Sequence, residues 1–335
     1  MQVLIVDQQQ VRELLPMGEC IPLMADTLAA LARGQALMPL RQVVALPDGA
    51  GALASMPAHL SSPPALGIKV ITVFPANHGT AFDSHQGAVL LFEAGQGRLL
   101  AILDASSITA IRTAAASAVA TRALSRPDAT RLALIGAGVQ AASHLEAMCL
   151  VRQLRHVQVW SRNSEHLRTF VERARSRHQI EVEGAVSAQA AVEGAEIVCT
   201  LTSSREPVVR GQWLRPGAHV NAVGASVRTA RELDGAAIAR ARVFVDSRES
   251  ARNESGDLLL AAAEGAIGEG HVQGEIGEVL TGRVSGRRSA DEVTVFKSLG
   301  LAVEDVASAH HIHGKAVASG IGTWVELGGG RDGGS

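Results

Sequence analysis

The sequence lacks an apolar run long enough to cross a bilayer, and it lacks a long basic stretch. Its opening, Met1–Asp7, has no basic region followed by an apolar stretch and a cleavage site, so it does not indicate a secretory signal. With a formal net charge of −2 and no basic stripe, a nucleic-acid role is not expected. The three cysteines, Cys20, Cys149 and Cys199, form no C-x-x-C pair, which favours a reduced cytoplasmic compartment over disulfides or zinc. We therefore expect a cytoplasmic protein without a membrane, nucleic-acid or metal partner.

The chain is long enough for two domains, at 335 residues with 47% hydrophobic content. The first stretch combines a helical opening with glycine- and proline-punctuated strand-like runs, which predict an antiparallel or mixed sheet. These runs are Gln42–Leu46, Gly67–Phe74, Ala88–Phe92 and Leu99–Asp104, and an alanine-rich helix over Ile108–Ser125 follows them.

The second stretch alternates short apolar runs with helical segments such as Gln140–Arg152 and Glu165–Arg177. This alternation predicts an α/β fold with a doubly wound, Rossmann-type parallel sheet. The expected strands are Arg131–Ile135, Val157–Trp160, Ile197–Leu201, His219–Val223 and Val243–Val245.

A helix predicted over Leu299–Ala318 returns the chain to the first domain, which makes that domain discontinuous. We expect a substrate-binding and dimerisation domain at residues 1–126 and 304–327, a dinucleotide-binding domain at 127–303, and a loose glycine-rich tail at 328–335.

A glycine-rich turn directly follows the buried strand Arg131–Ile135. Gly136-Ala137-Gly138-Val139-Gln140-Ala141 matches the G-x-G-x-x-G/A pattern, with a helix after it and a second strand ending about 25 residues on. The first glycine permits the tight turn, the second lets backbone approach a pyrophosphate, and the small last residue lets helix pack on strand. The pyrophosphate then meets the helix N-terminus, so this turn predicts a nicotinamide dinucleotide site.

The end of the second strand bears on the cofactor's phosphate state. NAD-specific enzymes usually place a carboxylate there for the ribose 2′-hydroxyl, whereas this chain has Ser161, Arg162 and Asn163. A hydroxyl, a guanidinium and an amide can bind a 2′-phosphate. The chemistry favours NADPH, with NADH possible, unless Arg162 is merely an exposed arginine.

Three cations stand out in the first stretch: Arg41 after Met38-Pro-Leu, Lys69 inside the apolar run Gly67–Pro75, and Arg112 in an alanine-rich helix. A charge in such a setting must be paired or functional, because burying it alone is costly. For each residue alone a structural ion pair is the simpler explanation, but together the three would form a carboxylate clamp.

The sequence resembles the ornithine cyclodeaminase/mu-crystallin family over nearly its whole length. The matching segments, in the family's order, are Gly67–Pro75, Asp104–Ala118, Ile135–Ala141, Pro216–Ser226 and Thr294–Asp305. The resemblance implies that Arg41, Lys69 and Arg112 meet a substrate carboxylate, with Lys69 beside the reacting carbon. It implies a homodimer built by the first domain and the C-terminal helix. The cofactor-lining residues are expected to be Ser84, His85, Thr113, the Ala137–Gln140 turn and Val223.

Three departures separate this chain from the cyclodeaminase branch of the family: two missing carboxylates, and the end of the second strand, which is acidic in those enzymes and Ser161-Arg162 here. Those enzymes carry an aspartate after Val-Gly-Gly, where this chain has Ser226, and a glutamate before Met-Pro, where it has Ala54. The segments Val220–Ser226 and Arg231–Asp234 instead resemble the mu-crystallin ketimine reductases, which act on cyclic imino acids and use NADPH well.

We therefore expect an NAD(P)H-dependent reductase of cyclic ketimine carboxylates. Arg41 and Arg112 would fix the carboxylate, and Lys69, with a pKa lowered by the neighbouring arginines, would donate or relay the proton. Ser226 would bind the ring nitrogen or a water, although an ordinary loop serine explains it as well. The alternatives are an ornithine cyclodeaminase, an alanine-dehydrogenase-like enzyme acting on an amino acid, and a non-enzymatic hormone-binding protein.

Overall fold

The computed structural model describes residues 2–77 and 80–328. The chain divides into two compact units: Met1–Arg112 with Leu301–Ser335, and Thr113–Gly300. Helix α3 (Ala105–Leu124) begins in unit one and continues into unit two. Within the described ranges, no single helix is long and apolar enough to span a membrane, although the bent pair of the first two helices passes that test jointly. The predicted glycine-rich tail lies, apart from Gly328, outside the described residues.

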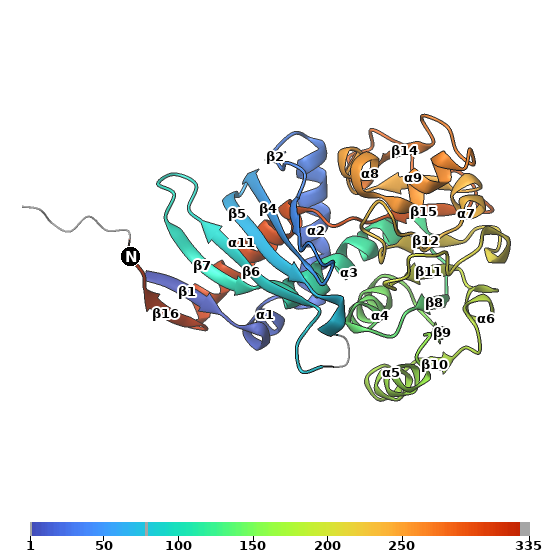
Figure 1. Ribbon diagram of the computed structural model, residues 1–335, viewed down its shortest axis with the longest axis horizontal. Helices are drawn as coiled ribbons and strands as arrows, with labels where there is room; N and C mark the ends of the chain where they lie inside the picture. The colour runs from blue at the N-terminus through green and yellow to red at the C-terminus, as the bar shows by residue number, and fades with distance from the viewer. Residues whose placement is uncertain (1, 78–79, 329–335) are drawn as a thin grey trace, which may run out of the picture. The chain divides into compact units, whose positions relative to one another are not determined.

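Unit one is built on a mixed sheet, as the sequence predicts (Figure 1). The strand order is β16-β1-β7-β6-β5-β4-β2, with β3 also pairing with β4. Only the β1–β7 pairing is parallel among the strand pairs of this sheet in the described chain. The strands are β1 (Gln2–Val6), β2 (Ala36–Leu37), β3 (Gln42–Ala45), β4 (Ala52–Ser61), β5 (Pro64–Val73), β6 (His85–Phe92), β7 (Leu99–Asp104) and β16 (Thr323–Glu326).

The helices of unit one are α1 (Gln8–Leu14), α2 (Met17–Ala32), the first part of α3, and α11 (Ala302–Ser319), with a 3-10 turn at Pro75–Asn77. The predicted helical opening corresponds to α1 and α2, but the short strand β1 precedes them and was not predicted. Helix α11 packs against β4, β5 and β6 and against α2. Gly67 on β5 permits this approach, since an added Cβ there would lie 3.0 Å from the Val306 side chain.

Unit two contains the predicted parallel sheet, in the order β10-β9-β8-β11-β12-β15-β13-β14, and every pairing within it is parallel among the described residues. The strands are β8 (Arg131–Ile135), β9 (His156–Trp160), β10 (Glu181–Gly184), β11 (Ile197–Thr200), β12 (His219–Ala222), β13 (Arg242–Val245), β14 (Val272–Glu275) and β15 (Thr294–Lys297). Five of these strands match the predicted ones within a residue at either end. Strands β10, β14 and β15 were not predicted, because they are short and carry charged residues.

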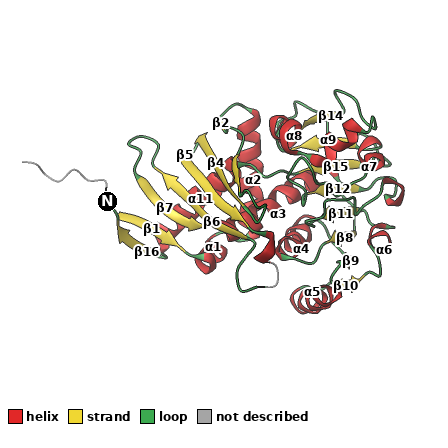
Figure 2. Ribbon diagram, viewed as in Figure 1, coloured by secondary structure: helices red, strands yellow, loops and turns green. Residues whose placement is uncertain are grey.

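Helices connect the strands of this sheet (Figure 2). Among them, α4, α5 and α6 pack against strands β8, β9 and β10. The apolar side chains buried between helices and sheet include Ile135, Val198, Val220 and Val295, none of them exposed to solvent. The helices after α3 are α4 (Val139–Val151), α5 (Ser164–Arg177), α6 (Ala188–Val192), α7 (Gly235–Ala239), α8 (Arg248–Glu254), α9 (Gly256–Ala263) and α10 (Ile276–Leu280), with a 3-10 turn at Gly211–Trp213.

The turn between β8 and α4 needs glycine at its first position. Gly136 has a φ of +126°, and an added Cβ would lie 2.7 Å from the backbone oxygen of Leu201. Gly138 differs, because its φ is −93° and an added Cβ would meet nothing within 4 Å. The fold therefore requires Gly136, whereas Gly138 leaves open space beside the backbone.

Gly136→Ala should lower the free energy of unfolding by about 1–3 kcal/mol, because alanine is strained at this φ and its Cβ meets the Leu201 oxygen. Gly138→Ala is the matched control and should change that free energy by less than about 0.5 kcal/mol. Denaturant unfolding of both variants measures the difference. Equal stability of the two variants would contradict the assigned role of Gly136.

Candidate active site

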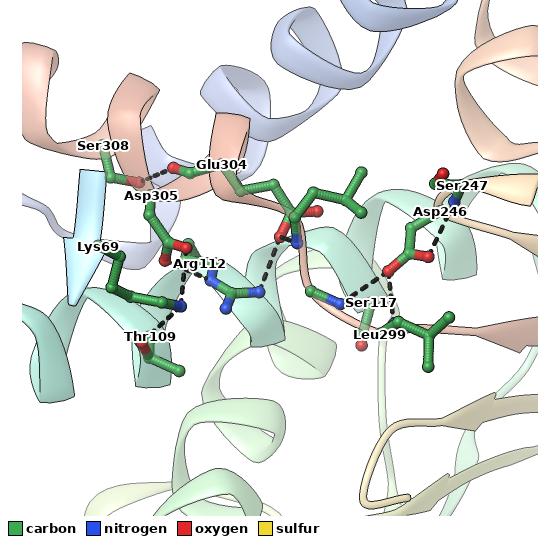
Figure 3. Close-up of polar contacts among 12 residues, drawn as sticks. Lys69, Thr109, Arg112, Ser117, Asp246, Ser247, Leu299, Glu304, Asp305 and Ser308 are labelled. Carbon is green, nitrogen blue, oxygen red and sulfur yellow. Dashed lines mark hydrogen bonds and ion pairs between the residues drawn. The ribbon is translucent and has the colours of Figure 1, made fainter. Parts of the chain in front are cut away.

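Unit one contains a buried cluster of two cations and two carboxylates (Figure 3). Lys69 Nζ on β5 lies 2.7 Å from Asp305 Oδ2 on α11. Arg112 on α3 donates from Nε to Asp305 Oδ1 at 2.9 Å and from Nη1 to Glu304 Oε2 at 2.8 Å. The side chains of these four residues are at most 4% exposed. Asp305 thus bridges two of the three cations selected from the sequence, Lys69 and Arg112.

Local sequence explains why these groups meet. Residues 65, 67, 69 and 71 alternate as the buried face of β5, and Gly67 on that face touches α11, so Lys69 points toward the same helix. Glu304 and Asp305 occupy the first turn of α11, where the helix dipole favours negative charge. Glu304 also accepts a hydrogen bond from the backbone N–H of Leu301, as in a capping box.

The electrostatic setting of Lys69 suits proton transfer. The pKa of Lys69 is lowered to about 8: burial is the largest cause, Asp305 opposes the shift, and the charges of Arg112 and Arg41 add to the lowering. The arginines lower the pKa as expected, but loss of hydration on burial is the larger cause. The ammonium also donates to Thr109 Oγ1 at 3.4 Å.

The structure places the remaining expected residues in both units. Arg41 is half-buried between β2 and β3, close enough for its charge to act on Lys69. Ser84 and His85 stand at the start of β6, where the Ser84 hydroxyl lies 3.0 Å from His85 Nδ1. Thr113 is buried on α3 and is the first residue of unit two.

The glycine turn of unit two fits a dinucleotide pyrophosphate. No side chain caps the N-terminus of α4. In the part of the chain that the structure describes, the backbone N–H groups of Val139 and Gln140 have no acceptor. Gln140 Oε1 is buried and likewise makes no hydrogen bond to a described residue. An anion bound at this helix end would accept hydrogen bonds from these backbone N–H groups, which are aligned with the helix dipole. It would lie beside Ala137 and the open space at Gly138.

The end of β9 presents Ser161, Arg162 and Asn163 as expected. Asn163 caps α5, because its side-chain oxygen accepts from the backbone N–H groups of Glu165 and His166. Ser161 Oγ accepts from the backbone N–H of Asn163 at 3.3 Å. The exposed Arg162 guanidinium has no ion-pair partner among the residues described. Only Arg162 thus adds a full positive charge at this strand end.

Sequence reasoning missed a buried carboxylate at the ends of β11 and β12. Glu232 accepts hydrogen bonds from Thr200 Oγ1, from the backbone and hydroxyl of Thr202, and from the backbone N–H of Gly224, at 2.6–2.7 Å. Burial raises the pKa of Glu232, and the nearby Asp257 charge adds to that effect. Glu232 thereby joins the loop after β11 to the Val223–Ser226 segment, in which Val223 and Ser226 are half-buried.

A second buried pair supports the same segment. Lys297 Nζ lies 2.9 Å from Asp257 Oδ2 and donates to the backbone oxygen of Ala225, while Asp257 Oδ1 accepts from the backbone N–H of Glu232. A signal for these residues exists in the sequence, since Lys297 ends an apolar strand and Glu304 and Asp305 open an apolar helix. Buried charges at such places need partners, but the sequence does not say which.

The parallel sheet and its glycine turn define an α/β protein with a Rossmann-type dinucleotide-binding unit. The sequence matches the ornithine cyclodeaminase/mu-crystallin family over residues 1–320, and the chain belongs to that family. It is 40% identical to ketimine reductase mu-crystallin of Mus musculus over 296 residues, which cover 88% of this chain and 90% of that protein.

Two solved structures are similar over nearly the whole chain. Thermococcus litoralis Δ1-pyrroline-2-carboxylate reductase, in complex with NADH and L-proline, has a TM-score of 0.94 and 37% identity, covering 96% of this chain and 99% of that one. An archaeal alanine dehydrogenase dimer with bound NAD has a TM-score of 0.92 and 31% identity, covering 98% of this chain and 100% of that one. The reductases among these relatives confirm the expected enzyme class, an NAD(P)-dependent oxidoreductase acting on C=N bonds.

Arg112→Ala should lower the free energy of unfolding by about 3–5 kcal/mol, because it leaves Glu304 and Asp305 buried without their guanidinium partner. Arg162→Ala removes an exposed arginine and should change that free energy by less than about 0.5 kcal/mol. Denaturant unfolding of the two variants tests this difference. A stable Arg112→Ala protein would show that the two carboxylates do not depend on this arginine.

Proposed function

We propose that the enzyme reduces cyclic ketimine carboxylates, Δ1-pyrroline-2-carboxylate and Δ1-piperideine-2-carboxylate, to L-proline and L-pipecolate. The observation that carries this proposal is the buried Lys69 ammonium beside Arg112, with Arg41 close enough to act on its charge. Cations in this setting suit a substrate that has a carboxylate next to a basic nitrogen. A relative is a ketimine reductase, and a solved neighbour is a pyrroline-2-carboxylate reductase with L-proline.

In this proposal the substrate carboxylate binds Arg41 and Arg112, which orients the ring. Reduced nicotinamide, when bound, supplies a hydride for the imine carbon. The C=N π bond breaks, a C–H bond forms at that carbon, and an N–H bond forms with a proton from Lys69. Lys69 Nζ is thus proposed to hold the proton, and Ser226 to hydrogen-bond the ring nitrogen or a water.

The residues at the cyclodeaminase positions argue against ornithine as the main substrate. Ala54 is a buried residue of β4 with no carboxylate, and Ser226 stands in place of an aspartate. A second ammonium group on the substrate would find neither of the two expected anions.

We also propose a homodimer formed through unit one, since one structural neighbour is a dimer.

An amino-acid dehydrogenase is a second candidate, because an archaeal alanine dehydrogenase has a similar structure. Its reductive reaction needs a 2-oxo acid with free ammonia, whereas the ketimine reductase needs only the preformed imine. One cofactor-oxidation assay, run with each of the two kinds of substrate, therefore distinguishes the two activities.

The expected result of that assay is NAD(P)H oxidation with both cyclic imines, exceeding by at least about 10-fold the rate with pyruvate and ammonia. Ornithine should release no ammonia. A cofactor-oxidation assay with each substrate, and an ammonia assay with ornithine, measure these activities. Oxidation with pyruvate and ammonia alone would establish the dehydrogenase instead, and ammonia release from ornithine without net cofactor change would establish the cyclodeaminase.

Arg162→Ala should weaken NADPH binding by roughly 5- to 150-fold, which is the loss of one charge-assisted contact to the 2′-phosphate. NADH has no such phosphate, so its affinity should hardly change. Titration of both cofactors by nicotinamide fluorescence gives the two dissociation constants, and a matched substitution of exposed Arg168 on α5 serves as the control. An equal loss for both cofactors would exclude the proposed phosphate contact.

A further inference from the structure

Asp305 is the one described residue whose carboxylate contacts both Lys69 and Arg112. Its Oδ2 lies 2.7 Å from Lys69 Nζ, and its Oδ1 accepts from Arg112 Nε at 2.9 Å. The Asp305 side chain is not exposed to solvent, so its charge acts on these two cations with little screening by water. Figure 3 shows the carboxylate between the lysine and the guanidinium.

The surroundings of Lys69 otherwise oppose its charge. Its amine is almost fully buried, and the charged groups that face it are Arg112 from α3, Arg41 from the segment before β3, and Asp305 from α11. Glu304 forms its ion pair with Arg112, and its charge affects Lys69 by partly neutralising that arginine. The buried Cys20 thiol of α2 lies close enough to Glu304 to be affected by its charge. Of these groups, Asp305 is the one in direct contact that favours the ammonium form.

The contacts of the Lys69 ammonium also limit where its N–H groups can point. Among the described residues, Lys69 Nζ contacts Asp305 and Thr109, while an ammonium has three N–H groups. The ammonium thus forms an ion pair with Asp305 and donates one hydrogen bond to Thr109. These two contacts hold the amine in place, and an N–H group directed at neither partner can point at a substrate atom.

We propose that Asp305 is a positioning residue that keeps Lys69 in its ammonium form and aims the remaining N–H at the ring nitrogen of the substrate. This inference rests on the proposed reduction of cyclic ketimines. Asp305 touches neither substrate nor cofactor in this role, and it acts through Lys69. In the reaction Lys69 gives one proton to the nitrogen as the imine carbon receives hydride, NAD(P)⁺ forms, and Lys69 then takes a proton from solvent.

The sign of the pH effect follows from this role. Lys69 has a pKa of about 8, and Asp305 raises it against the effect of burial. A proton donor is active below its pKa, so the pH profile of kcat/KM should fall above pH 8 or so. Removing the Asp305 charge lowers the Lys69 pKa, which moves this fall to lower pH.

Asp305→Asn should therefore move the alkaline limb of kcat/KM by about one to two pH units toward acid, as expected for loss of one adjacent opposite charge. Glu304→Gln is the matched control, because Glu304 pairs with Arg112 and not with Lys69. It should move the limb much less than Asp305→Asn does, because its charge acts on Lys69 only by way of Arg112. Asp305→Glu should restore the parental limb at least in part, which a merely structural role would not require. An unmoved limb in a folded Asp305→Asn enzyme would overturn the proposal, as would equal shifts in both variants.

A second measurement needs no turnover, and it compares the parental enzyme with the folded Asp305→Asn variant. The chain has three lysines, Lys69, Lys297 and Lys315, so protein labelled with ¹³C at the lysine ε carbon gives few NMR signals to assign. Lys69 should titrate near pH 8 in the substrate-free enzyme, and the more exposed Lys315 provides an internal reference. In Asp305→Asn the Lys69 signal should titrate about one to two pH units lower, and an unmoved Lys69 titration in the folded variant would overturn the proposal.

The two measurements distinguish the two proposals. If no cyclic imine is reduced, the proposed function fails, while the titration in the substrate-free protein still decides whether Asp305 holds the Lys69 proton. If imines are reduced but the limb does not follow Asp305, the function stands and the positioning role fails.

Discussion

The cost of burying charge governs the candidate site. Lys69 and Arg112 lie where water cannot solvate them, so Lys69 depends on the Asp305 carboxylate and Arg112 on those of Glu304 and Asp305. Those carboxylates belong to α11, nearly 200 residues further along the chain than Arg112. The return of the chain to unit one is therefore a requirement of the site's electrostatics as well as of its packing.

The same constraint recurs in unit two. Glu232, Asp257 and Lys297 are fully buried and hold the segments that follow β11 and β12. Since all strands of this sheet are parallel, these segments lie at the same edge of the sheet as the glycine turn. Hydrogen bonds from four donors fix the Glu232 carboxylate, which makes the loops around it rigid supports. Each unit thus uses a buried carboxylate to organise the surroundings of a candidate binding segment.

Features that depend on residues close together in the chain were predictable from the sequence. The strand β8, the turn at Gly136 and helix α4 follow one another within the chain, so strand period, glycine and helix start are all visible there. The charge of Lys69 inside an apolar strand likewise indicated that this residue is ion-paired or functional. Strand β4 was missed although it is long, because Ala, Ser, Pro and His interrupt its apolar alternation and its pairing with β5 decides its structure.

By itself, the sequence determined the α/β class, the cofactor turn, the cations worth examining and the family, because these depend on neighbouring residues or on ordered segments. Only the tertiary structure decided that Asp305 bridges Lys69 and Arg112, and that burial outweighs the arginines in lowering the pKa of Lys69. The physical reason is that desolvation and ion pairing depend on which distant atoms surround a charge. That information exists only once β5, α3 and α11 have packed together.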